Sequence, residues 1–316
     1  MNNKILYDKF CEDNKDTLIF YQPWWLDTVC GPNNWDVLLY IKNKEILGAF
    51  PYFFKKKIGL KLLITPKLSP VMGPLVSEKV KINIDKSKVV IELIKMLPRF
   101  NYFSINLNYT FKDWLPFYWK GFIQSTNYKC IIENLSDDKK IFNNFSSANK
   151  RMLEKANLNK LKFNPDIKIE VFYQYYESFL KKRKKKIFNS YDEIKNIYHN
   201  LKKKNQGCAF SVLDKNNNIL SIALIIWDKK GAHMILNSTD PEMKNTGCTQ
   251  YLIKEIILFL KDKTKSFNFE ASMDKKKFNF YNSFGGNISS YYKIVKSNPS
   301  YLRYLIKDNN QNLFEI

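Results

Sequence analysis

The sequence is poor in the residues that build most metal and disulfide sites. It contains only two histidines, His199 and His233, and its five cysteines show no CxxC spacing. An odd number of scattered cysteines argues against a disulfide framework or a zinc site. Two histidines leave little material for a His-based metal site or a Ser-His-Asp hydrolase. We therefore expect no metal.

Long apolar runs are also absent. No uninterrupted run reaches the ~18 residues that a membrane-spanning helix needs. The first nine residues, Met-Asn-Asn-Lys-Ile-Leu-Tyr-Asp-Lys, carry charges where a signal peptide would have its apolar core. These absences predict a cytoplasmic protein with no transmembrane segment, and they leave peripheral contact with a membrane open.

Acidic residues are few compared with basic ones: 30 Asp and Glu face 52 Lys and Arg, a formal net charge of +22. Such a charge suggests an anionic partner, such as RNA, a CoA-type cofactor or an acidic membrane surface. A Lys- and Asn-rich composition inherited from an AT-rich genome is the alternative. The one dense basic run, 181–186, follows a helical-looking segment at 169–180. It therefore predicts a solvated helix end rather than an RNA clamp.

The composition is that of a globular protein, with 45% hydrophobic and 16% aromatic residues in 316. A chain of this length can hold two domains of ordinary size. Two strand-turn-strand units stand out, the first at 35–41 and 46–54 and the second at 208–213 and 219–227.

Three further pairs of blocks repeat at nearly one offset. They are 102–108 with 266–272, 117–122 with 280–285, and 125–131 with 289–295. Phe103 and Phe267 are 164 residues apart (267 − 103), as are Tyr128 and Tyr292 (292 − 128). Amphipathic helical patterns precede them at 88–97 and 250–260. Each half thus predicts a hairpin, a helix, a strand, a short aromatic helix and a strand.

This order of elements resembles the acetyltransferase superfamily, the GNAT fold. Phe-Asn-Phe-Glu-Ala-Ser-Met at 267–273, Phe-Asn-Phe-Tyr-Asn-Ser-Phe-Gly-Gly at 278–286 and Tyr-Tyr-Lys-Ile at 291–294 resemble the C-terminal signature of Fem-like proteins. Those are tandem-domain ligases that add amino acids to peptidoglycan precursors, with relatives that use acyl-CoA. The segment 20–29 resembles the opening helix of that group.

The resemblance implies an α/β (α+β) fold of two tandem GNAT-fold domains, each a mixed twisted sheet flanked by helices. We expect a degenerate N-terminal domain at 1–136 and a C-terminal domain with the donor site at 137–316, joined near 134–140.

In the superfamily, a turn between a strand and the next helix binds the donor pyrophosphate, with a pattern like Arg/Gln-x-x-Gly-x-Gly/Ala. The matching positions here are Lys244, Asn245, Thr246, Gly247, Cys248 and Thr249. Amides freed at a helix N-terminus can bind phosphate oxygens. Lys244 stands for the usual Arg or Gln, and Thr249 for the final small residue. A merely polar helix entry is the alternative.

The resemblance leaves two donors open. Tandem Fem ligases commonly carry Phe-Lys before the Phe-Gly of the last helix, and that Lys is implicated in the tRNA-linked reaction. Here the position reads Phe280-Tyr281, which favours acyl-CoA over aminoacyl-tRNA. The acceptor would be a small molecule or a lipid-linked or nucleotide-linked precursor, and tRNA stays a candidate partner.

Glu270 is the candidate general base. It lies in an apolar run that we expect to be a strand, where burial would raise the pKa of its carboxyl group toward neutrality. Strand alternation would place Asn268, Glu270 and Ser272 on one face. A structural pair with a neighbouring Lys or Tyr is the alternative for Glu270.

The remaining candidates come from aromatic and polar residues. Tyr281 could reprotonate a leaving thiolate, Ser272 and Asn237 could offer hydrogen bonds in the cleft, and Trp25 could form a wall for the substrate. Core packing is the alternative for Tyr281 and Trp25. We interpret His233 as a core histidine whose hydrogen bonds are satisfied.

The sequence thus predicts an N-acyltransferase or aminoacyltransferase that acts on an amine, less readily a hydroxyl, of a cell-envelope precursor or amino sugar. Two alternatives remain: a Fem-type aminoacyl-tRNA-dependent peptidyltransferase, and a non-catalytic module that binds RNA or an acidic membrane. The chain lacks RNP-type RNA-recognition runs, which speaks against RNA binding.

Overall fold

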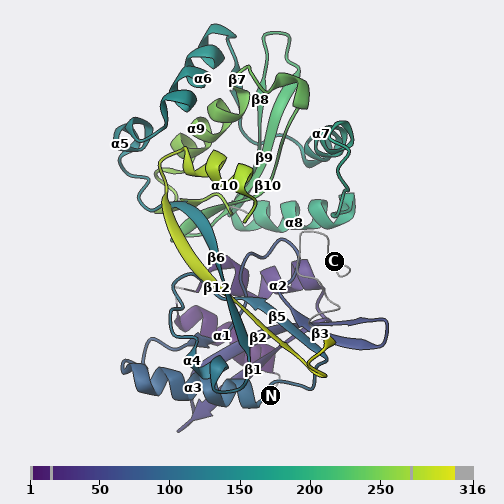
Figure 1. Ribbon diagram of the computed structural model, residues 1–316, viewed down its shortest axis with the longest axis vertical. Helices are drawn as coiled ribbons and strands as arrows, with labels where there is room; N and C mark the ends of the chain where they lie inside the picture. Colours follow the sequence, from purple (N-terminus) through teal and green to yellow (C-terminus); the bar gives the residue numbers. More distant parts are fainter. Residues whose placement is uncertain (1–2, 15–16, 271–272, 303–316) are drawn as a thin grey trace. The chain divides into compact units, whose positions relative to one another are not determined.

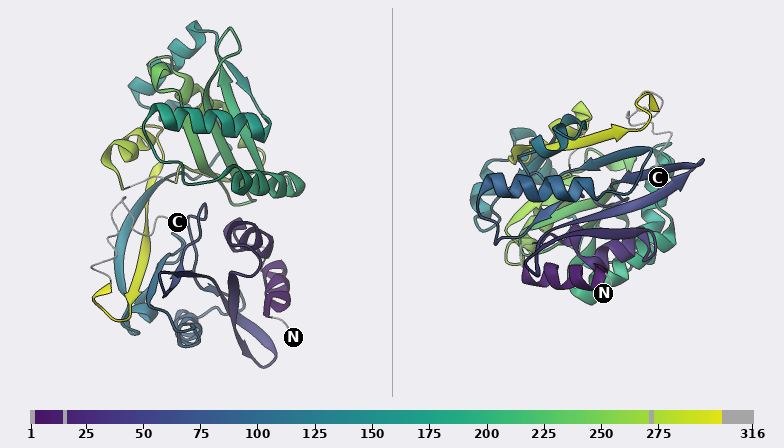
Figure 2. Two further views of the ribbon diagram at one scale, coloured as in Figure 1. Left: turned by 90° about the vertical axis from the view of Figure 1, so that its right-hand side faces the viewer. Right: turned by 90° about the horizontal axis from the view of Figure 1, so that it is seen from below.

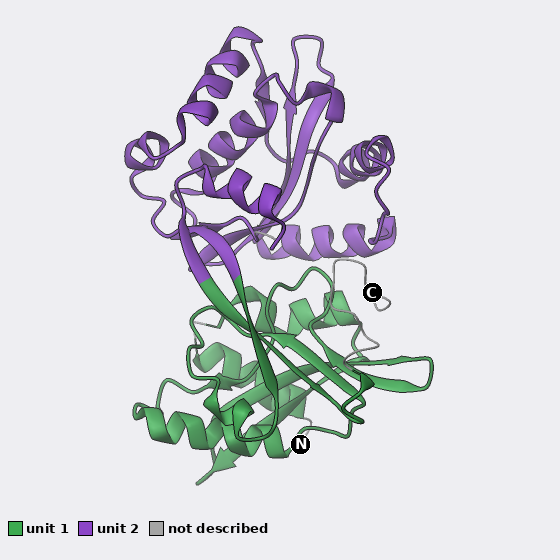
Figure 3. Cartoon of the chain, viewed as in Figure 1, with its two compact units in different colours: residues 1–127, 290–316 green, residues 128–289 purple. Residues whose placement is uncertain are grey.

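The computed structural model describes residues 3–14, 17–270 and 273–302. The chain forms two compact units, shown in Figure 3. Unit 1 comprises residues 1–127 and 290–316, and unit 2 comprises residues 128–289. The expected division was 1–136 and 137–316. The compact units divide the chain differently because the last strand pairs within unit 1.

Unit 1 contains a mixed sheet with helices around it. Its elements are α1 (Asn3–Asp13), η1 (Ile19–Tyr21), α2 (Pro23–Cys30), β1 (Trp35–Lys42), β2 (Glu45–Lys57), β3 (Leu60–Ile64), β4 (Leu75–Val76), α3 (Asn83–Lys95), β5 (Tyr102–Asn106) and α4 (Leu115–Tyr118). The strand order is β1-β2-β3-β5-β12, with β4 on β2, and β3 runs parallel to β5. The strands β6 (Ile123–Ile132) and β12 (Asn287–Ser297) contribute residues to both units.

Unit 2 repeats the same design (Figure 1). Its elements are α5 (Asp138–Asn143), α6 (Ser147–Leu158), β7 (Lys162–Asn164), α7 (Ile169–Lys182), α8 (Tyr191–Lys204), β8 (Gly207–Leu213), β9 (Ile219–Trp227), β10 (Gly231–Thr239), η2 (Pro241–Met243), α9 (Cys248–Leu260), β11 (Ser266–Asn268) and α10 (Lys275–Asn282). The strand order is β6-β11-β10-β9-β8-β7, with β10 and β11 parallel.

The two halves exchange their last strands in the same register. In unit 1, Phe103 of β5 is opposite Lys296 of β12. In unit 2, Phe267 of β11 is opposite Ile132 of β6. Both partners are related by the offset that relates the phenylalanines, since 296 − 132 and 267 − 103 are both 164. The predicted order of hairpin, helix, strand, short helix and strand is therefore confirmed in both halves. The sequence did not predict that the final strands change places.

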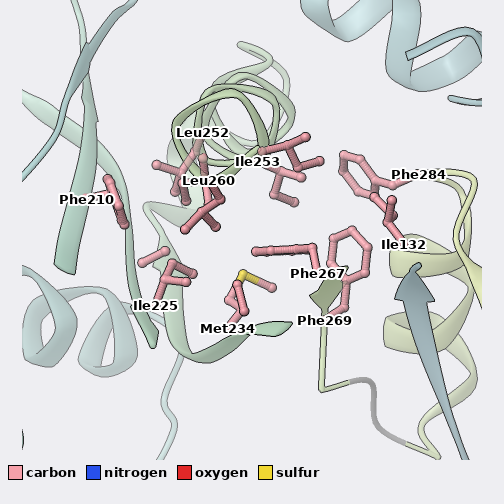
Figure 4. Close-up of a cluster of buried hydrophobic side chains, with 14 of the residues drawn as sticks. Ile132, Phe210, Ile225, Met234, Leu252, Ile253, Leu260, Phe267, Phe269 and Phe284 are labelled. Atoms are coloured by element: carbon pink, nitrogen blue, oxygen red, sulfur yellow. The ribbon is translucent and has the colours of Figure 1, made fainter. Parts of the chain in front are cut away.

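The core of unit 2 lies on both faces of the sheet. All nine residues of β9 are buried, as expected for a strand covered on both sides. The helix α9 packs on one face, where Ile225, Met234, Leu252 and Phe267 meet (Figure 4). The helices α7 and α8 pack on the other face and lie nearest the viewer in the left panel of Figure 2. Burying one such aliphatic side chain contributes ~1.5–3 kcal/mol.

Aromatic rings fill the core of unit 1. Phe50, Phe103, Phe117 and Phe122 form a buried cluster, and the centroids of Phe103 and Phe122 lie 5.0 Å apart in an edge-to-face arrangement. The repeated short aromatic helix therefore serves packing in this half. Within the described residues, no helix combines the length and the apolar character needed to cross a bilayer.

Candidate functional site

The parallel strands β10 and β11 stay paired over only part of β10. The pairing runs from Gly231 opposite Ser266 to His233 opposite Asn268, while β10 continues to Thr239. A strand edge that continues past its neighbour offers backbone donors and acceptors to a ligand. The second half of β10 is therefore the part of the sheet best suited to bind an extended ligand.

A bulge in β10 places polar side chains on both faces of the sheet at this point. The register with β9 shifts between Met234 and Leu236. Met234 is opposite Ile225 and Asn237 is opposite Ala223, and both partners belong to the core under α9. Opposite residues share a face, so Asn237 faces α9. His233, opposite Ile226, points to the other face, which α7 and α8 cover.

A buried charged cluster occupies the His233 face. Glu270 Oε1 lies 2.6 Å from His233 Nδ1, and both side chains are largely buried, with 18% and 6% exposed. Lys129 of β6 is also buried, with 3% exposed. Burial raises the pKa of the Glu270 carboxyl, but the charge of Lys129 and the hydrogen bond and charge of His233 together bring it below its ordinary value. Glu270 is therefore ionised at neutral pH.

Two sequence expectations for Glu270 are thus wrong. Its pKa is lowered rather than raised, because the sequence did not show that Lys129 and His233 would face it. It also lies beyond the strand, which ends at Asn268. Glu270 has a left-handed backbone with φ of 47°, and its amide donates to Asn268 Oδ1 over 2.9 Å. The predicted alternation through Ser272 does not apply, since β11 ends before Glu270; Ser272 lies outside the described residues.

Asn268 carries an unusual buried donor. Its side chain is buried, with 2% exposed, and its Oδ1 accepts from the Glu270 amide. Its Nδ2 is one of the buried polar atoms without a hydrogen-bond partner within the described part of the chain. Unsatisfied buried amides are rare and mark strain, a bound water or a ligand contact.

Tyr281 and Asn237 meet as the sequence predicted for two residues of one site. Asn237 Nδ2 donates to Tyr281 Oη over 3.2 Å, which joins α10 to the second half of β10. The Tyr281 ring stacks on Phe269, with centroids 5.3 Å apart. Burial raises the pKa of Tyr281, although the Asn237 hydrogen bond and the charge of Arg183 oppose the shift. Its phenol therefore stays protonated at neutral pH.

The predicted phosphate-binding turn has the expected strand, turn and helix. Gly247 is the N-cap of α9, with φ of 83°. Lys244 and Asn245 are exposed, Thr246 is half-buried, and Cys248 is buried. The Thr249 hydroxyl lies 2.8 Å from the Thr239 hydroxyl.

Close packing constrains Gly247 more than ligand access does. A Cβ at this position would stand 1.9 Å from the backbone oxygen of Met152 in α6. A β-branched residue at 247 would therefore disturb the fold, and such a variant cannot report on donor binding alone.

The basic run 181–186 is only in part a solvated helix end. Lys182 Nζ pairs with Asp240 Oδ2 at 2.7 Å, and Arg183 Nη2 donates to the Thr239 carbonyl over 2.6 Å. Arg183 Nε is buried without a partner within the described ranges. Burial and the charges of Lys277 and Arg183 lower the pKa of Lys185. Cations thus gather between the end of β10 and the start of α10, a placement that the local sequence did not reveal.

Trp25 lies in unit 1 and is fully buried. Its indole Nε1 donates to Ser69 Oγ over 2.8 Å, and its ring packs edge-to-face on Phe20 at 5.6 Å. These contacts are those of a core residue, the alternative that the sequence left open for Trp25.

No protein-family model and no curated protein matches this sequence. Solved structures do match. FemX covers 97% of this chain and 98% of its own, with a TM-score of 0.69 and 12% identity. L-PGS from Bacillus licheniformis covers 86% and 87%, with a TM-score of 0.56 and 11% identity. A tandem GNAT protein from the clavulanic acid biosynthesis pathway covers 83% and 82%, with a TM-score of 0.51 and 9% identity.

These matches confirm the predicted fold class over almost the whole chain. The identities of 9–12% are those of a shared fold. The chain has the mixed α/β fold of Fem-like and tandem GNAT acyltransferases.

Proposed function

We propose that this chain transfers an acyl or aminoacyl group from an activated donor, with acyl-CoA as the first candidate, to an amine on a cell-envelope precursor or amino sugar. The observation that carries the proposal is the contact of Tyr281 with Asn237 on the part of β10 that continues past β11. The acyltransferase fold and this polar pair coincide at one strand edge.

The donor would lie along the second half of β10. Its phosphates would reach the exposed Lys244 and Asn245 at the start of α9, where helix amides favour anions. Its reactive carbonyl would lie beside Asn237. Such positioning contributes much of the rate in acyl transfer, because the donor is already activated.

The two faces of β10 would supply the two proton transfers. On one face the ionised Glu270, hydrogen-bonded to His233, would take the proton of the attacking amine. On the other face Tyr281, kept protonated by burial, would give a proton to the leaving thiolate. A thiol with an ordinary pKa of ~8.5 is more acidic than a phenol at ~10, so Tyr281 would act by a hydrogen bond that strengthens as the thiolate forms.

Asn268 would serve the carbonyl oxygen. Its orphaned Nδ2 lies on the face of the sheet that holds His233, and a buried amide donor stabilises the oxyanion of a tetrahedral intermediate. Glu270 and Asn268 are joined by a hydrogen bond, so a ligand that engages one would also constrain the other.

Donor binding can be tested without knowing the acceptor. CoA should raise the unfolding temperature at 0.15 M salt, and acyl-thioesters should be found by mass spectrometry of the purified chain. Heparin is the matched polyanion. If CoA gives no shift and heparin binding falls linearly with log salt, charge alone drives binding and the acyl-CoA proposal is wrong. Stabilisation by aminoacyl-tRNA but not by CoA would instead support the Fem-type donor.

A further inference from the structure

Five large apolar side chains are exposed together in unit 1. They come from the start of α3 and from α4, and each exposes between 47% and 62% of its surface: Ile82, Ile84, Leu115, Tyr118 and Trp119. We call them the aromatic patch. Single exposed apolar residues are ordinary on a protein surface, but a group of this kind usually marks an interaction site.

The geometry of α4 explains why the group is exposed. Leu115, Tyr118 and Trp119 are spaced by three and four residues and share one helical face. The opposite face buries Pro116 and Phe117 in the core. The helix therefore has an apolar side facing inward and another facing solvent, whereas a surface helix normally presents polar residues outward.

A hydrogen bond joins the two parts of the patch. Ser87 Oγ in α3 donates to Asp113 Oδ2 just before α4, over 2.6 Å. The helices α3 and α4 pack against each other and appear side by side in Figure 1. The patch is thus held on two packed helices of a single unit.

The charges around the patch are mainly positive. Residues 79–88 contain four lysines and one aspartate, and Lys112 and Lys120 flank α4. Both acids near the patch are engaged: Asp85 pairs with Lys88 at 3.0 Å, and Asp113 accepts from Ser87 and from the Leu115 amide. A partner that meets the aromatic patch therefore meets a cationic rim.

We propose that the aromatic patch docks unit 1 on the surface of an anionic lipid bilayer. Trp and Tyr prefer the headgroup region, where an apolar ring and a polar tip are both accommodated. Lysines beside them are attracted by anionic lipids. Protein interfaces, by contrast, are depleted in lysine. The proposal does not rest on acyl transfer, since a chain without that activity would still dock.

The test uses the full chain and sedimentation with vesicles. Wild type should bind vesicles of phosphatidylcholine with 30% phosphatidylglycerol and should bind pure phosphatidylcholine weakly. The double variant Tyr118→Ser/Trp119→Ser keeps the net charge, so non-specific attraction is unchanged. It should lose about tenfold or more in partitioning, because its apolar contribution is gone.

The control variant is Ile58→Ser/Leu158→Ser. These side chains expose 86% and 81% of their surface and lie outside the patch, so this variant should bind as wild type does. All variants should keep the wild-type unfolding temperature, which excludes misfolding as the cause.

Three results would overturn the proposal. One is that wild type ignores anionic vesicles in 0.1 M salt. Another is that the patch variant and wild type partition within twofold of each other, because charge alone would then explain binding. The third is that the patch variant abolishes self-association in light scattering without changing vesicle binding, because the occupant would then be a second copy of this chain.

Discussion

His233 Nδ1 and Glu270 Oε1 lie 2.6 Å apart, although 37 residues separate them in the sequence. The contact depends on the parallel pairing of β10 and β11, which sets His233 beside Asn268, and on the left-handed turn that brings Glu270 back toward β10. Buried Lys129 supplies the positive charge that helps to keep Glu270 ionised.

Replacing Glu270 with Gln should cut turnover by about 10²- to 10⁴-fold, the usual worth of a general base. It should also destabilise the chain by ~3–5 kcal/mol, because Lys129 would lose its buried partner charge. Denaturant unfolding and steady-state kinetics measure the two effects. The double variant Glu270→Gln/Lys129→Met should regain stability but not turnover. If turnover returns with stability, Glu270 is a scaffold residue.

The stability that Glu270 contributes should depend on pH in one direction. Its pKa in the folded chain lies below the ordinary value of 4.5. The contribution is therefore complete above about pH 4.5 and is lost as pH falls through the folded pKa. The difference in unfolding free energy between wild type and Glu270→Gln should be constant from pH 7 to 5 and shrink on further acidification. A difference that grows below pH 4.5 would mean that the pKa is raised instead.

Replacing Tyr281 with Phe should lower turnover by about 10²-fold while donor affinity changes little, because the ring and its stacking on Phe269 remain. Loss of the hydrogen bond to Asn237 should cost only ~1 kcal/mol of stability. The matched control is Tyr173→Phe, which loses a hydroxyl bonded to the Asn189 carbonyl. Equal turnover in the two variants would remove Tyr281 from the chemistry.

Replacing Gly247 with Ala should destabilise the chain by more than the ~1–2 kcal/mol that a left-handed alanine costs, because the new Cβ would strike the Met152 oxygen. Gly59 is the control: its φ of 74° is similar, and no atom lies within 4 Å of its Cβ position. Urea unfolding of Gly247→Ala and Gly59→Ala isolates the collision. Equal losses would show that α6 yields at this point.

Local patterns in the sequence predicted most of the secondary structure. The predicted strand at 219–227 is β9, and the helical pattern at 250–260 falls within α9 (Cys248–Leu260). Both are long runs whose burial and periodicity are local properties. The offset between Phe103 and Phe267 likewise identified the repeated strands β5 and β11.

Contacts between distant segments were not predictable in the same way. Nothing near Ile132 or Lys296 indicates which sheet each strand joins, since both would complete either one. The environment of Glu270 depends on Lys129, 141 residues earlier (270 − 129), and on a turn that its apolar neighbours disguise as strand. Arg183 seemed to belong to a solvated run, because its acceptor, the Thr239 carbonyl, lies 56 residues away.

Hydrogen exchange with and without a donor tests the central claim most directly. Backbone amides should be followed by mass spectrometry in the free chain, with acyl-CoA, and with heparin at the same charge concentration. The account predicts that acyl-CoA selectively slows exchange at 235–239 of β10, at 244–249 and along α10, and that heparin does not. Protection confined to other segments, or the same pattern with heparin, would contradict a donor site at this strand edge.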